Sequence, residues 1–214
     1  MGRPAREAWT RYYADGKDFR RLSDAERALL AEHAPVPEGG GRALDVGCGT
    51  GELAVHLASV GYAVDAVDYS DGAIARAREE HREVEGVRWL QLDIEADDPT
   101  GLDGTSNRKD TGTGTGTDAG YDLITLRLAY AFLRDRGRVL HALGERLREG
   151  GAVVVVTPLA DSTPADRRGI ALDEDEIGLL ASGWQQATRL EADGCAFLVL
   201  RGPCHRDTTR RKGS

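Results

Sequence analysis

The sequence is poor in several residue types, and each shortage narrows what the protein can be. Its 214 residues include three cysteines, too few and too far apart for a disulfide framework or a zinc site. No run approaches the about 18 apolar residues that a membrane-spanning helix needs, and the polar start at Met1 lacks a signal peptide. Only three of the 28 Lys and Arg residues are lysine. These features predict a cytoplasmic protein without a metal site.

The charge balance is acidic, with a formal net charge of -8 and a pI of about 5.2. Hydrophobic residues make up 40% and charged residues 30%, which is typical of a globular chain. Nucleic-acid binding depends on a cationic surface, so this balance argues against it. We expect one domain, monomeric or homodimeric, that binds neither nucleic acid nor a membrane.

Short apolar segments alternate with amphipathic ones along most of the chain. The predicted strands are 43–46, 62–67, 87–92, 121–126 and 150–158, followed by a hairpin of 185–191 and 196–201. The predicted helices are 50–60, 70–83, 136–148 and 173–181. Strands that alternate with helices indicate right-handed crossovers and a parallel sheet covered on both faces, with the final hairpin adding an antiparallel strand at its edge.

Three segments lie outside this alternation. Residues 5–33 predict two helices, the second opening with a capping box of Ser23 and Glu26. Residues 96–120 contain TGTGTGT and lack periodicity, which predicts disorder. The polar, basic tail is compatible with a linker to a fusion partner domain beyond the C-terminus. We therefore divide the chain into an N-terminal helical cap at 1–38, a core at 39–202 and a flexible basic tail at 203–214.

The stretch LDVGCGTG forms a bare turn between the first strand and its helix. Its pattern is Asp45-x-Gly47-x-Gly49-x-Gly51. Glycines at such a turn let a ligand approach the backbone closely. The nicotinamide fingerprint G-x-G-x-x-G would need a glycine where this chain has Glu52. A carboxylate at Asp45 would also repel a pyrophosphate and favour a cationic ligand.

The sequence RALDVGCGTGELAVHLASVGYAVDAVDYSDGAIARAREE, at 42–80, resembles the class I S-adenosylmethionine-dependent methyltransferases of the small-molecule, actinobacterial-like type. The resemblance covers about residues 40–200 and is sharpest over 42–93. It implies an α/β, Rossmann-like fold with a mostly parallel seven-stranded sheet, helices on both faces and an antiparallel edge strand. It also implies methyl transfer from S-adenosyl-L-methionine to a small-molecule acceptor by in-line displacement, with S-adenosyl-L-homocysteine as product.

The resemblance assigns cofactor contacts to the tips of the first three strands. Asp45 would lie near the cofactor's amino group and Asp68 would accept both ribose hydroxyls. Tyr69 would pack against the adenine, and Asp93 would accept from its amino group with Ile94 beside the ring. The full predicted set is Asp45, Gly47, Cys48, Gly49, Gly51, Asp68, Tyr69, Asp93, Ile94 and Arg127. Taken singly, these features also fit a tight turn or a helix cap, but their place at three successive strand tips favours a ligand site.

Candidates on the acceptor side are fewer. Arg127 and Tyr130, which follow the fourth strand, are the predicted catalytic residues. Arg127 either binds an acidic substrate group through two hydrogen bonds or pairs with a nearby acid, and Tyr130 either orients a nucleophile or packs. Trp9, Tyr12 and Tyr13 form a predicted lid that shields the sulfonium, grips the acceptor by cation–π contact, or packs on the core.

No catalytic base is assured by the sequence. Many relatives carry a histidine where this chain has Ala131-Phe132. An amine or thiolate acceptor needs no protein base, whereas a hydroxyl acceptor usually needs one. Two other interpretations therefore stay open, a non-catalytic module that binds S-adenosylmethionine and a nicotinamide oxidoreductase. A methyltransferase acting on a macromolecule is a third, opposed by the acidic charge.

Overall fold

The computed structural model describes residues 9, 11–13, 15–17, 20–96, 102 and 120–204. Most of the segment 96–120 predicted to be disordered, and residues 205–214 of the predicted tail, lie outside the described part of the chain. Among the described helices, none is both long and apolar enough to cross a membrane.

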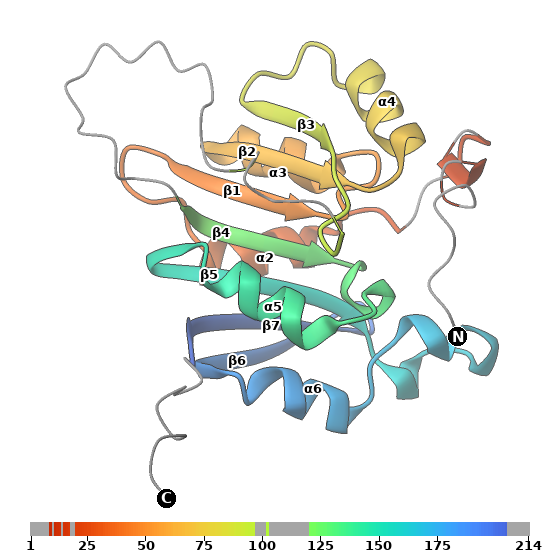
Figure 1. Ribbon diagram of the computed structural model, residues 1–214, viewed down its shortest axis with the longest axis vertical. Helices are drawn as coiled ribbons and strands as arrows, with labels where there is room; N and C mark the ends of the chain where they lie inside the picture. The colour runs from red at the N-terminus through yellow and green to blue at the C-terminus, as the bar shows by residue number, and fades with distance from the viewer. Residues whose placement is uncertain are drawn as a thin grey trace, which may run out of the picture.

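A seven-stranded sheet forms the centre of the molecule (Figure 1). Its strands are β1 Gly41–Val46, β2 Tyr62–Asp68, β3 Val87–Gln91, β4 Tyr121–Arg127, β5 Leu147–Pro158, β6 Trp184–Ala192 and β7 Cys195–Pro203. The strand order is β3-β2-β1-β4-β5-β7-β6, and the first five strands in the chain run parallel. β7 lies between β5 and β6 and is antiparallel to both, so the predicted antiparallel hairpin forms one edge of the mostly parallel sheet.

Four of the five described α-helices follow a Ser or Asp whose side chain accepts a backbone N–H, and the other follows Gly51. The α-helices are α2 Asp24–His33, α3 Glu52–Val60, α4 Asp71–Glu80, α5 Arg136–Gly144 and α6 Glu174–Ala181; the 3₁₀ turns are η2 Tyr130–Phe132, η3 Ala160–Ser162 and η4 Ala165–Ile170. At the start of α2, the Ser23 and Glu26 side chains each accept from the other's backbone N–H, as predicted.

The helix predicted at 136–148 is too long. α5 ends at Gly144, and the chain enters β5 at Leu147. Leu147 pairs with Tyr121 at the start of β4, and the register shifts by a bulge before Leu123 pairs with Ala152. Leu147 and the residue after it therefore pair in a strand although their local spacing favours a helix, because helix propensity is a weak preference that tertiary contacts override.

Alternate residues of the central strands enter two separate cores, as a sheet covered on both faces requires. On β5, Val153 and Val155 face one core with the buried side of α5 and α6, whereas Val154 and Val156 face the other with α3. Figure 1 shows the helices flanking the sheet. The strands are thereby fixed so that the tips of β1, β2, β3 and β4 share one edge, beyond which the N-terminal aromatic residues lie.

Candidate functional site

A cavity of about 290 Å³ opens at the carboxyl edge of the sheet. It is lined by the turn after β1, the tip of β2, the residues after β3 and the residues after β4. The N-terminal residues Trp9 and Tyr13 close one of its walls. The predicted convergence of strand tips at one ligand site therefore exists in the folded chain.

The glycine turn after β1 packs closely against Ala129 and Tyr13, which explains why it contains glycines. Gly47 has φ +70°, and a Cβ built on it would lie 2.6 Å from the Cβ of Ala129. Gly49 has φ +55°, and a Cβ there would lie 2.9 Å from the hydroxyl oxygen of Tyr13. A side chain at either position would be strained and would fill the cavity floor. Cys48 lies between them and also lines the cavity.

Asp45, at the end of β1, is the most unusual group in the cavity wall. Only 2% of the residue is exposed, and its Oδ1 accepts from the Thr125 hydroxyl at 2.7 Å. Its Oδ2 is buried and has no hydrogen-bond partner within the described residues. Burial raises the pKa of this carboxyl to about 6, against the lowering effects of Thr125 and of Arg127. A buried acceptor without a partner is costly, so this oxygen fits a ligand that brings a cationic donor such as an amino group.

Asp68, at the tip of β2, is held by backbone N–H groups. Its Oδ2 accepts from Gly49 N at 3.0 Å and its Oδ1 from Ser70 N at 2.9 Å. These contacts join the β1 turn to the β2 tip and orient a carboxylate that is 6% exposed. Asp68 and the following Tyr69 both line the cavity. Their placement fits a ligand with hydroxyl donors and a flat ring.

The residues after β3 are placed differently from the prediction in one respect. Leu92 and Ile94 line the cavity, but Asp93 between them is not among its lining residues. The Asp93 carboxylate instead accepts from Glu95 N at 3.1 Å within the turn. The apolar neighbours therefore supply the surface here, and Leu92 is a residue that the sequence prediction missed.

An aromatic cluster forms the wall on the β4 side. Trp9 meets Phe132 edge-on at 5.4 Å between ring centroids and stacks on Tyr13 at 5.8 Å. Tyr12 meets both Trp9 and Tyr13 edge-on at 5.4 Å but does not line the cavity. The three predicted lid residues thus contact one another. Phe132, at a place where many relatives carry a histidine, completes the cluster.

Tyr13 is the lid residue nearest the glycine turn. It is 8% exposed, and burial together with the negative charge of Asp68 raises the pKa of its hydroxyl above the ordinary value. The hydroxyl therefore stays protonated at neutral pH. It serves as a hydrogen-bond donor or packing group and not as a proton acceptor.

Arg127 lines the cavity, as predicted for a residue after β4, but its guanidinium is engaged by other parts of the protein. Its Nε and Nη2 donate to the two carboxylate oxygens of Glu26, each at 3.0 Å. Its Nη1 and Nη2 also donate to the backbone carbonyls of Arg20 and Arg21, at 2.8 and 2.7 Å. The other interpretation, an arginine paired with an acid, is the one the fold adopts, although the acid is buried.

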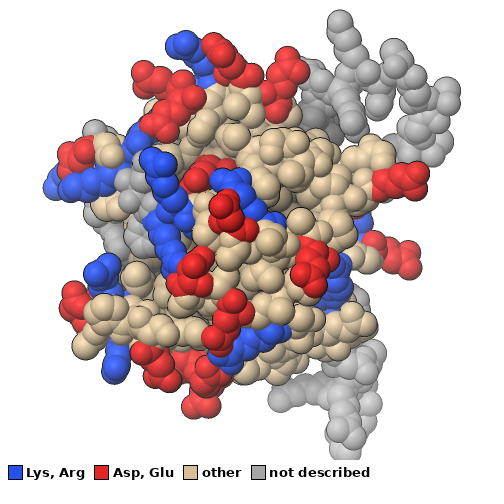
Figure 2. All heavy atoms as spheres, turned by 180° about the vertical axis from the view of Figure 1, so that it is seen from behind, with Lys and Arg blue, Asp and Glu red and all other residues tan. Residues whose placement is uncertain are grey.

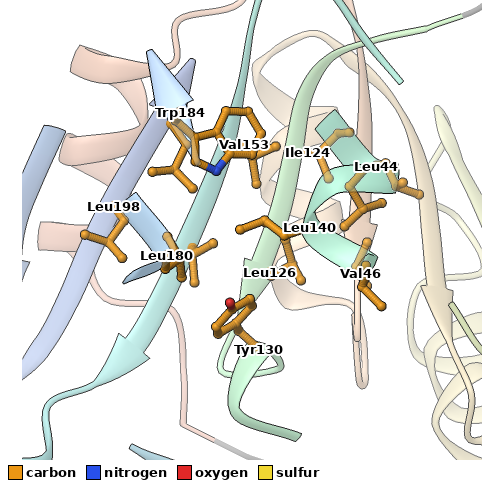
Figure 3. Close-up of a cluster of buried hydrophobic side chains, with 14 of the residues drawn as sticks. Leu44, Val46, Ile124, Leu126, Tyr130, Leu140, Val153, Leu180, Trp184 and Leu198 are labelled. Atoms are coloured by element: carbon orange, nitrogen blue, oxygen red, sulfur yellow. The ribbon is translucent and has the colours of Figure 1, made fainter. Parts of the chain in front are cut away.

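Tyr130, unlike Arg127, is not among the residues that line the cavity. It is 5% exposed and packs in the core with Leu126, Leu140 and Leu180, as Figure 3 shows. The Arg136 guanidinium lies 5.7 Å from its ring centroid. The turn η2 directs this side chain toward α5 and α6, which favours the packing interpretation over the predicted catalytic one.

Leu128 is a lining residue with a backbone conformation that sequence reasoning had no means to find. Its φ is +56°, a left-handed value that is uncommon for a leucine, and its N–H donates to Val156 O at 2.8 Å. Such strain is found where a surrounding structure fixes the chain at a functional site. Here it turns the chain sharply after β4 and places Ala129 against the glycine turn.

Comparison with known proteins agrees with this geometry. A family model described as a methyltransferase domain matches residues 15–199. The chain belongs to the methyltransferase domain family. The prediction of a methyltransferase with the class I, Rossmann-like fold is confirmed, and the nicotinamide interpretation is set aside.

A relative from Mycobacterium tuberculosis (strain ATCC 25618 / H37Rv), named an uncharacterized methyltransferase, is 32% identical over 137 residues. The match covers 64% of this methyltransferase and 59% of the relative, so it spans less than two thirds of that protein.

Two solved structures have a similar fold. One is the N-methyltransferase NodS from Bradyrhizobium japonicum WM9 in complex with S-adenosyl-L-homocysteine, with a TM-score of 0.65, 19% identity, and coverage of 92% of this chain and 97% of that one. The other is a SAM-dependent methyltransferase from Aquifex aeolicus, with a TM-score of 0.65, 18% identity, and coverage of 89% and 96%. At these identities the likeness concerns the fold.

Proposed function

We propose that the protein transfers a methyl group from S-adenosylmethionine to the nitrogen of an apolar small-molecule amine. The single observation that carries this proposal is the division of the cavity wall into two sides. Asp45, Asp68 and the glycine turn form a polar side over β1 and β2, whereas Trp9 and Phe132 form an aromatic side next to β4.

The polar side fits the cofactor. Asp45 would pair its buried Oδ2 with the amino group, and Asp68 would accept from the ribose hydroxyls. Tyr69 and Ile94 would pack against the adenine. When bound, S-adenosylmethionine supplies a methyl group activated by its sulfonium. The protein then contributes alignment and the exclusion of water, and alignment alone can lower a barrier by roughly 7–11 kcal/mol.

The aromatic side favours an amine. As the new N–C bond forms, the nitrogen gains positive charge, and aromatic faces stabilise a cation by about 0.5–2 kcal/mol. The N–H proton then leaves to solvent, so the amine needs no protein base. The described residues of this side, Trp9 and Phe132, carry no carboxylate or imidazole. The acidic lining residues and His81 come from other segments of the chain, and His81 Nε2 lies 3.0 Å from Thr50 O.

The surface supports a small acceptor. Acidic and basic side chains are interspersed on the face seen in Figure 2, without a continuous basic track for a polyanion. This distribution agrees with the net charge of -8.

The test is a pair of acceptor panels that share carbon skeletons. Apolar primary and secondary amines, and the phenols or alcohols with the same skeletons, are incubated with the protein and S-adenosylmethionine. Methylated products are measured by mass spectrometry. We expect products from amines and none from the matched hydroxyl compounds. Products from hydroxyl compounds alone would refute the amine assignment. Tight binding of S-adenosylhomocysteine without any product would instead favour the non-catalytic module.

A further inference from the structure

The contacts of Arg127 extend beyond a simple ion pair. Four of its hydrogen bonds reach three residues that precede or begin α2, namely Glu26 and the backbone of Arg20 and Arg21. The Arg127 side chain is 11% exposed and that of Glu26 is 1% exposed. The end of β4 thereby holds a segment that lies more than a hundred positions earlier in the sequence.

Glu26 has two tasks at this point. Its Oε2 accepts from Ser23 N at 2.9 Å, which closes the capping box of α2, and the same oxygen accepts from Arg127 Nη2. A bidentate pair of this kind is strong and geometrically specific. A displaced segment would leave a buried charge without its partner, which is strongly unfavourable. The pair therefore selects one position for the start of α2.

Other elements hold the same short segment. The N–H of Leu22 donates to Glu52 Oε2 at 2.7 Å, from the first turn of α3. The Arg20 guanidinium reaches Cys195 Sγ at 3.0 Å, at the start of β7. Residues 20–22 are thus fixed across the carboxyl edge of the sheet by α3, β4 and β7.

The residues of the aromatic wall come shortly before this segment in the chain. Lys17 O accepts from Arg76 Nη1 at 3.1 Å, and Lys17 N donates to Tyr12 O at 3.3 Å. Trp9 and Tyr13 then line the cavity.

We propose that Arg127 and Glu26 form a clamp that fixes residues 20–22 to the sheet edge and so holds the Trp9–Tyr13 wall over the cofactor cavity. Arg127 lines the cavity, and in this proposal it is a positioning residue that acts through the N-terminal segment. The clamp does not depend on which acceptor the protein methylates.

The experiment compares Arg127→Gln with Arg148→Gln in the full chain. Arg148 makes an ion pair with Asp122 at 2.8 Å, near the opposite end of β4 from Arg127, and is a matched control. Hydrogen–deuterium exchange is measured by mass spectrometry over residues 9–30, and calorimetry measures the affinity for S-adenosylhomocysteine. We expect Arg127→Gln to speed exchange in this region at least tenfold and to weaken binding at least tenfold. Arg148→Gln should change neither.

Two further variants keep the test decisive if Arg127→Gln does not fold. Glu26→Gln removes the charge of the partner and should speed the same exchange. Glu52→Ala removes the acceptor for Leu22 N and should speed exchange mainly at that residue. The clamp is refuted if exchange over 9–30 is unchanged in the folded variants, or if Arg148→Gln changes it equally. If the wild type fails to bind S-adenosylhomocysteine, the proposed function is rejected while the exchange comparison still decides the clamp.

Discussion

Replacing Asp45 by Asn should stabilise the ligand-free protein while weakening its hold on the cofactor. The carboxylate is buried, its Oδ2 has no partner within the described residues, and its pKa is raised from 3.8 to about 6, chiefly by burial. The folded protein therefore binds a proton at this site more tightly than the unfolded chain. Stability falls as the pH rises from about 4 to 6 and the penalty persists above pH 6.

The magnitude follows from that difference in pKa. One pKa unit corresponds to about 1.4 kcal/mol, so the charged Asp45 destabilises the fold by about 3 kcal/mol at pH 8. Asn keeps an oxygen for the Thr125 hydroxyl but buries an amide N–H₂, which costs about 1–2 kcal/mol. The net gain at pH 8 is about 1–2 kcal/mol, or about 2–8 °C in melting temperature for a chain of this size.

The assay is urea denaturation of the wild type and Asp45→Asn between pH 4 and 8. The variant should be more stable at pH 8 and lose this advantage toward pH 4, where the wild-type carboxyl is protonated. Asp65→Asn is the control, because Asp65 is 4% exposed but paired with Arg42 and Arg88, and its variant should be less stable at pH 8. A stability difference for Asp45→Asn that does not vary with pH would refute the reasoning. Calorimetry should show at least tenfold weaker binding of S-adenosylhomocysteine.

Three other predictions concern separate parts of the site. Asp68→Ala should weaken S-adenosylhomocysteine binding tenfold or more, by about 1.5–3 kcal/mol, in calorimetry, whereas Asp71→Ala nearby should not. Gly51→Ala should lower the free energy of unfolding, measured in urea, by about 2–4 kcal/mol, because Gly51 has φ +92° and lies against the indole ring of Trp89. Gly178→Ala, in open space on α6, should raise that free energy by about 0.5–1 kcal/mol. Phe132→Ala should raise the KM for an amine acceptor about tenfold and leave S-adenosylhomocysteine affinity within about twofold; an equal loss of both would contradict the two-sided cavity.

The sheet and its ligand edge were predictable because their signals are local. The turn after β1 combines alternate glycines with an acid. Ser23 and Glu26, within four residues of each other, predict the start of α2. Strand periodicity also placed Asp68 at a strand tip, where parallel strands bring their ends together. Each of these features is fixed by short-range chemistry that a single segment of sequence carries.

The alternatives that the sequence left open depend on contacts between distant segments. From its position after β4, Arg127 could bind a substrate or pair with an acid, and its partner proves to be Glu26, which the sequence marks only as a capping residue. The direction of Tyr130 depends on the turn η2 and on the left-handed conformation of Leu128. Neither leaves a local pattern, because a leucine has no preference for that conformation.

The contrast between Asp45 and Arg127 gives a physical criterion for separating binding residues from structural ones at the same edge. Both are charged, largely buried and adjacent to the cavity. Arg127 makes four hydrogen bonds within the protein, so the fold already compensates for its charge. Asp45 keeps a buried oxygen without a partner among the described residues, at a cost to stability. A ligand that supplies a cationic donor recovers that cost on binding, which is the expected behaviour of a residue selected for recognition and not for folding.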